Sequence, residues 1–176
     1  GGFARTGKAF AYEHYDVVPD LICCGKGMGG GLTLAGVIGK KYLMDLPDVG
    51  SMSSTHSANP LVCVAGITVL DEIKNKKLIR EAKRKGKFLS NKLNEIKKKY
   101  TERVNYVSGK GLIAAIMFRD ARGKPDPALA SKISEKCMQK GLLVVHTGRE
   151  SIKIGPPLTI TDEALAEGLQ VLEDSI

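Results

Sequence analysis

The sequence Asp20-Leu-Ile-Cys-Cys-Gly-Lys-Gly-Met-Gly-Gly-Gly-Leu-Thr-Leu-Ala35 places one lysine between two short apolar runs. Runs as short as Leu21–Cys24 and Leu34–Ile38 predict buried β-strands. Lys26 lies in the loop between them, among glycines that provide no side chains. Lysine is rarely buried without a partner and glycine costs backbone entropy, so stability alone does not explain this loop. The loop leaves space around one amine for a flat ligand.

Three interpretations of this loop compete. Gly25–Gly30 matches the dinucleotide fingerprint G-x-G-x-x-G, but that fingerprint must open a helix, whereas the residues that follow resemble another strand. A flexible glycine turn with a solvated lysine is the plainest alternative, and the local sequence alone favours it. In the third interpretation, the Lys26 amine carries a cofactor aldehyde as an imine. Removing such an amine from water favours its neutral, nucleophilic form.

Neighbouring motifs favour the third interpretation. Four occur in order: Gly2-Phe-Ala-Arg-Thr-Gly-Lys-Ala-Phe-Ala-Tyr-Glu-His14, Val18-Pro-Asp-Leu-Ile22, Gly25-Lys-Gly-Met-Gly-Gly-Gly31 and Ser54-Thr-His-Ser-Ala-Asn-Pro-Leu61. Together they resemble the class III pyridoxal-phosphate aminotransferases, the ornithine, acetylornithine and 4-aminobutyrate group. The resemblance implies an α/β fold of type I. In that fold, the end of the large domain, with its mixed sheet and helices, precedes a small α+β C-terminal domain.

The resemblance also implies a function. It predicts an enzyme that moves an amino group from an amino acid or other primary amine to a 2-oxo acid through pyridoxal 5′-phosphate held as an aldimine on Lys26. It implies a homodimer with shared active sites, in which Thr55 binds the cofactor phosphate of the partner subunit, and the pattern of cysteines predicts a cytoplasmic protein. Alternatives are a racemase, epimerase or decarboxylase of the same fold, or a non-catalytic fragment that acts only in dimer contact.

Thr55 precedes a predicted helix, for which Asn59 is the expected N-cap and Pro60 the first residue. A threonine hydroxyl and free amides near a helix N-terminus suit a phosphate group. The plainer alternative is a turn hydroxyl that bonds its own backbone.

Lys153 lies in Ser151-Ile-Lys-Ile-Gly-Pro-Pro-Leu-Thr-Ile160, which resembles the family pattern R-x-x-P-P-L-x-I. The arginine of that pattern can bind the substrate carboxylate, and Lys153 stands in its place. Lysine is a point charge and lacks the bidentate fork of arginine. Lys153 therefore binds the substrate carboxylate more weakly than arginine would, or other residues anchor the substrate. Thr33 also departs from the family, which usually has proline there.

Three regions are expected: residues 1–74 as the end of the large domain, 75–100 as a connecting basic helix, and 101–176 as the small domain. Family members are much longer, and this chain looks like their C-terminal part. Residues that the family uses upstream, such as the aspartate beside the pyridine nitrogen, are absent from it. We therefore expect the isolated fragment to be inactive.

Periodicity predicts further elements in the second half of the chain. The expected strands are Val104–Val107, Leu112–Phe118, Leu142–His146 and Ile152–Ile154. The expected helices are Lys74–Tyr100, Ala128–Lys140 and one capped by Thr161. The first should bury a stripe made of Leu78, Ala82, Phe88, Leu89, Leu93 and Ile96.

The net charge of +8 is concentrated in this basic helix, where Lys74–Lys99 holds twelve Lys or Arg residues against two Glu. Because aromatic residues are not interleaved with the charges, a solvated helix face is favoured over a nucleic-acid surface. No apolar run reaches the length of a membrane span, so neither nucleic acid nor membrane is an expected partner. The four cysteines lack the spacing of a metal site and are expected to be reduced and buried.

Overall fold

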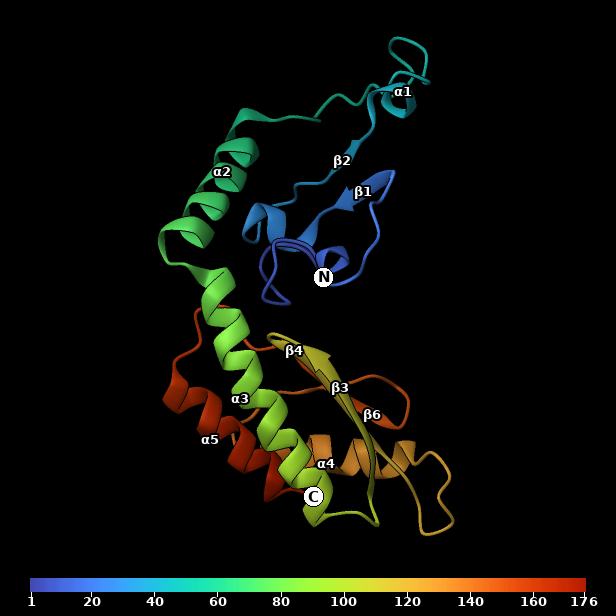
Figure 1. Cartoon of the computed structure of the whole chain (residues 1–176), viewed down its shortest axis with the longest axis vertical. Helices are drawn as coiled ribbons and strands as arrows, with labels where there is room; N and C mark the ends of the chain where they lie inside the picture. The colour runs from blue at the N-terminus through green and yellow to red at the C-terminus, as the bar shows by residue number, and fades with distance from the viewer. The chain divides into compact units, whose positions relative to one another are not determined.

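The structure, a computed structural model, describes residues 1–176, which divide into two units (Figure 1). The first unit comprises Gly1–Ala4 and Lys8–Ile79, and the second comprises Arg5–Gly7 and Arg80–Ile176. Three N-terminal residues thus belong with the C-terminal part of the chain. No helix is both long and apolar enough to cross a membrane.

The first unit is organised around the glycine loop. Strand β1 (Leu21–Cys24) pairs antiparallel with β2 (Gly36–Gly39), and the 3₁₀-helix η2 (Lys26–Gly29) lies between them. The short helices η1 (Ala11–His14) and α1 (Lys41–Met44) flank this hairpin. No α-helix follows β1 directly, as the dinucleotide fingerprint requires, so that interpretation is wrong.

The strands of the first unit are more exposed than predicted. In β1 only Cys24 is buried, whereas Cys23 is exposed, because successive side chains of a strand point to opposite faces. The expectation of four buried cysteines is therefore wrong for Cys23, and Cys63 is only partly buried. All four thiols are free.

Helix α2 (Pro60–Asn75) begins as predicted. The Asn59 side chain accepts a hydrogen bond from the Leu61 amide at 2.9 Å, and Pro60 is the first helical residue. The helix packs against η2, and Gly66 faces this contact: a Cβ there would lie 3.5 Å from the Met28 carbonyl oxygen of η2 and would overlap a methyl group of Leu34. Large apolar side chains along α2 remain exposed: Leu61, Val64, Ile67 and Leu70.

The predicted basic helix does not start at Lys74. Helix α2 continues to Asn75, and a new helix, α3, runs over Leu78–Lys99. Lys77 interrupts them with a φ of 52°, a left-handed conformation that no α-helix contains. The four polar residues at 74–77 separate the apolar positions Ile73 and Leu78, and they form the boundary of the basic helix, whereas they were predicted to form its start.

The second unit contains an antiparallel sheet with the strand order β3-β4-β6-β5. The strands are β3 (Val104–Lys110), β4 (Ile113–Phe118), β5 (Val145–His146) and β6 (Ser151–Ile154). The hairpin turn between β3 and β4 is shorter than predicted, because pairing continues to Lys110 and Ile113. Strand β5 is also shorter than predicted.

Helices α3, α4 (Pro127–Gln139) and α5 (Asp162–Glu173) contribute to one core with the inner face of the sheet. Thr161 caps α5 as expected, accepting a hydrogen bond from the Ala164 amide at 3.1 Å. The α3 stripe is buried except for Phe88, which is 46% exposed. Phe88 precedes Leu89, and one residue rotates a helix by about 100°, so the two cannot share a face. Lys85 occupies the stripe position between Ala82 and Leu89.

Candidate functional site

Lys26 has an unusual backbone conformation. Its φ is 49°, in the left-handed region that residues with a Cβ seldom adopt. The chain reaches it through Gly25, which is fully extended, and leaves through Gly30 and Gly31, which both have positive φ. Strained conformations of this kind persist where the surrounding structure fixes them, and they cluster at functional sites.

The surroundings of Lys26 leave room for a ligand. A Cβ added to Gly27 or Gly31 would meet no atom within 4 Å, and one added to Gly25 would make only ordinary contacts at 3.9 Å. The side chain of Lys26 is exposed and makes no hydrogen bond or ion pair within the chain. By contrast, Lys40 in the same unit bonds Asp20 at 2.6 Å. A free amine in a glycine-rich loop fits a cofactor that carries an aldehyde.

Thr55 lies in the irregular segment that leads into α2. Its hydroxyl makes no hydrogen bond within the chain, so the plainer role as a self-bonded turn hydroxyl does not apply. The N-terminus of α2 has few free backbone N–H groups for an anion. Pro60 has no N–H, and the amides of Leu61 and Cys63 already bond Asn59. The Thr55 hydroxyl is available as a donor close in sequence to this helix start.

The glycine loop contacts the middle of α2, whereas Thr55 precedes the helix. The loop packs against Gly66, which is six residues, or about 9 Å of helix, beyond Pro60. Thr55 precedes Pro60 by five more residues, and no hydrogen bond joins it to Lys26.

Lys153 belongs to the second unit, on strand β6, where it pairs with Ala115 and Val145. Its neighbour Ile152 is fully buried, so alternation directs Lys153 to the opposite, exposed face of the sheet. The Lys153 ammonium has no partner within the chain.

Sequence reasoning missed two cationic side chains that hold the segment after β6. The Arg5 guanidinium donates to the carbonyl oxygens of Leu112, at 3.2 Å, and Pro156. The buried Lys85 ammonium donates to the carbonyl oxygen of Ile160. Burial lowers the pKa of Arg5 below its ordinary value. The pair of prolines, which lack N–H groups, was the available signal that outside donors would be needed.

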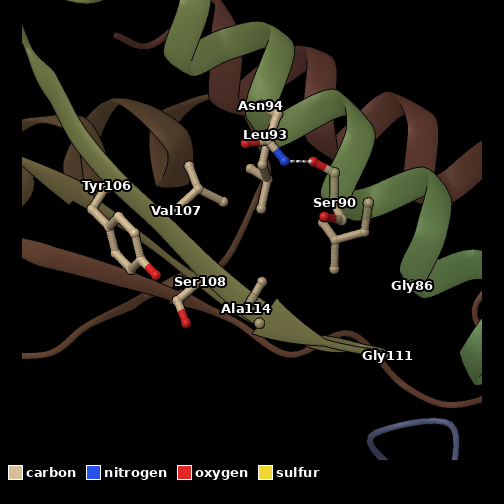
Figure 2. A pocket seen from close by; sticks show the side chains of 11 residues that line it. Gly86, Ser90, Leu93, Asn94, Tyr106, Val107, Ser108, Gly111 and Ala114 are labelled. Atoms are coloured by element: carbon tan, nitrogen blue, oxygen red, sulfur yellow. Dashed lines mark hydrogen bonds between the residues drawn. The ribbon is translucent and has the colours of Figure 1, made fainter.

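The second unit also contains a pocket of about 200 Å³ between α3 and β3 (Figure 2). Figure 2 shows Ser90 and Asn94 on the helix and Tyr106 and Ser108 on the strand, and apolar side chains such as Leu93 also line the pocket. No charged side chain lines this pocket, and it contains none of the predicted site residues. It is therefore separate from the candidate site.

The family model for class III aminotransferases matches residues 1–176. The chain belongs to the class III aminotransferase family. Members of this family use pyridoxal 5′-phosphate. The sequence-based recognition of the family is thereby confirmed.

Relatives of this class III aminotransferase chain include enzymes with two kinds of activity. It is 37% identical to a 4-aminobutyrate aminotransferase of Mycobacterium leprae over 97% of its own length and 39% of that protein. It is also 37% identical to an alanine/serine racemase of Pyrococcus horikoshii over 99% of its length and 37% of that protein.

Solved structures of the family agree with the fold. An acetylornithine aminotransferase from Elizabethkingia anophelis superposes with a TM-score of 0.89 and 32% identity, over 99% of this chain and 43% of that one. The mixed α/β fold thus matches aminotransferases of fold type I. Against these three proteins the chain spans 37% to 43% of the relative's length.

Proposed function

We propose that this chain is part of a pyridoxal-phosphate aminotransferase that moves an amino group from an amino acid or other primary amine to a 2-oxo acid. The observation that carries the proposal is the geometry of Lys26, a free and exposed amine in a left-handed backbone conformation between two glycines. Family membership supports the same chemistry.

Lys26 would hold the cofactor covalently through its Nζ atom. The bound cofactor supplies an electron sink for the substrate carbon that loses its proton. When its amine is free, Lys26 would act as the base that takes this proton from the substrate carbon and holds it on Nζ for its return. The glycines at positions 25, 27 and 31 keep side chains out of the space beside it.

Two other residues complete the proposed site. The Thr55 hydroxyl of one chain would bind the cofactor phosphate next to Lys26 of a second chain, which makes a homodimer the active form. The glycine loop contacts the middle of α2, Thr55 precedes the helix, and no hydrogen bond joins Thr55 to Lys26 within one chain, which supports a role in the partner's site. Lys153, which is exposed and unpaired, would bind the substrate carboxylate as a single point charge.

Racemisation is the second candidate function. Two relatives that are each 37% identical to this chain are racemases, the alanine/serine enzyme and a leucine/methionine racemase of Thermococcus litoralis. Both activities begin with proton removal by the same lysine, and they differ in where the proton is returned. Products distinguish them: transfer yields an oxo acid and a new amino acid, whereas racemisation yields the enantiomer without oxo acid.

The test is covalent trapping in the complete protein. Pyridoxal phosphate is added, the protein is reduced with borohydride, and the modified lysine is located by peptide mass mapping. We expect the label on Lys26 and its loss in Lys26→Ala, with Lys40→Ala as the matched control. Label spread over the lysines of α3, or transamination that survives in Lys26→Ala, would show that Lys26 is not the cofactor lysine. The same experiment on the 176-residue chain alone tests the alternative of a non-catalytic fragment, for which no label on Lys26 is expected.

A further inference from the structure

The pairing between β4 and β6 ends at a proline. Ala114 and Ile154 form the last pair of this ladder, and two residues further the same register places Leu112 opposite Pro156. Proline has no N–H, so it cannot donate to the Leu112 carbonyl across the ladder. Partly buried carbonyls at a strand end are unfavourable unless another donor takes over.

The Arg5 guanidinium is that donor. A single guanidinium nitrogen donates both to the Leu112 carbonyl, at 3.2 Å, and to the Pro156 carbonyl. The Leu112 amide in turn donates to the Arg5 carbonyl at 2.9 Å. Arg5 thus replaces the missing rung between the two strands, and its backbone is fixed to the same residue that its side chain contacts.

Two further contacts hold the N-terminal segment at Thr6 and the segment from Pro156 to Ile160 in place. Gly111, with a φ of 57°, lies so close to Thr6 that a Cβ there would overlap its backbone. At the far end of the proline segment, the buried Lys85 ammonium donates to the Ile160 carbonyl. The segment from Pro156 to Ile160 is therefore held at both ends by cationic side chains. Arg5 holds the end next to β6, and Lys85 holds the other end.

We propose that Arg5 is a positioning residue for Lys153, and through it for the carboxylate of the amino acid or oxo acid substrate. The inference rests on the proposed role of Lys153. Lys153 lies on the short strand β6, three residues before Pro156 in the sequence. The last residue of β6 that pairs with β4 is Ile154. Without Arg5 the end of β6 has no cross-strand bond at Pro156, and the direction of the Lys153 side chain is less well fixed.

The test compares Arg5→Gln, Arg5→Lys and Lys153→Met in the complete protein. Arg119→Gln is the matched control, because Arg119 also donates to a backbone carbonyl of the second unit, that of Thr101, at 2.6 Å. We expect Arg5→Gln to raise the KM for the amino acid roughly tenfold, which corresponds to one lost interaction of about 1.4 kcal/mol, with kcat changed less than about twofold. Arg5→Lys should give an intermediate KM, because lysine keeps the charge without the planar fork. The control should leave both constants unchanged.

A double variant separates positioning from general stability. If Arg5 acts through Lys153, adding Arg5→Gln to Lys153→Met should raise KM no further than Lys153→Met alone. Additive effects, or a fall in kcat at unchanged KM, would show that Arg5 is only structural. If Arg5→Gln does not fold, Arg5→Lys is compared in the same double variant. An unchanged KM in Lys153→Met alone would instead contradict the proposed carboxylate contact.

Discussion

Gly86 of helix α3 lies directly against the backbone of Gly111 in the turn between β3 and β4. A Cβ added to Gly86 would overlap the Cα and carbonyl group of Gly111, and one added to Gly111 would overlap Thr6. Three segments distant in sequence therefore meet with no side chain between them. The N-terminal segment, the hairpin turn and α3 can approach this closely only because both positions are glycine.

Gly86→Ala should destabilise the second unit by about 1–3 kcal/mol, because the methyl group forces the backbones apart. Helix propensity alone predicts the opposite sign, since alanine favours a helix interior by about 1 kcal/mol over glycine. Gly168→Ala in α5 is the matched control, because its added Cβ would meet only a movable Leu142 methyl group at 3.3 Å. Thermal unfolding followed by circular dichroism compares the two variants. Equal stability of both would show that the close approach is absent.

Stability of the second unit should fall in acid through Glu173. This buried carboxylate bonds Lys99 at 2.7 Å and Lys92 at 3.0 Å, and these contacts lower its pKa below the ordinary value. A lowered pKa stabilises the folded state above the unfolded value of about 4.3, and this stabilisation is lost as pH falls through the folded pKa. The Arg84–Asp162 contact lowers the pKa of Asp162 and acts with the same sign.

Glu173→Gln should therefore destabilise the chain at pH 7 by about 1–2 kcal/mol and have less effect at pH 3. Unfolding in urea at several pH values measures both quantities. Glu167→Gln, on the exposed side of the same helix, should change neither. If Glu173→Gln destabilised the chain equally at both pH values, the ion pairs would not be the cause.

Lys153→Arg should lower the KM for a carboxylate substrate about three- to tenfold, because arginine offers two parallel hydrogen bonds where lysine offers a point charge. Lys153→Met should raise that KM by a similar factor. Lys98→Met, which removes an exposed and unpaired charge from α3, is the control for net charge. Steady-state kinetics of the complete protein provides the measurement. Unchanged KM in both Lys153 variants would place the carboxylate elsewhere.

Mixed dimers should reveal whether Thr55 serves the partner subunit. A dimer of one Lys26→Ala chain and one Thr55→Ala chain keeps one intact site if Thr55 acts in trans, because both wild-type residues then meet at one interface. If Thr55 acts in cis, neither site is intact. We expect the mixed dimer to recover about half the wild-type activity, whereas each homodimer is impaired. Activity no higher than that of the homodimers would contradict the shared site.

The sequence by itself determined the features that depend on neighbouring residues. Asn59 and Thr161 cap their helices through bonds to amides two and three residues away, and the buried leucines of α5 follow from helical spacing. The four motifs around Lys26 identified the family because their order along the chain is itself the signal. Each of these inferences uses information that is local in the sequence.

Only the folded chain shows which distant backbone groups the side chains of Lys85 and Arg5 bond. Helical spacing places Lys85 on the buried stripe but does not show the carbonyl that it meets, and the polar run at 74–77 does not show that the helix breaks at Lys77. Arg5 belongs to the second unit because its partners, Leu112 and Pro156, are more than a hundred residues away in the sequence. A hydrogen bond to a backbone carbonyl can be made by any donor that reaches it, so only the folded chain shows which donor does.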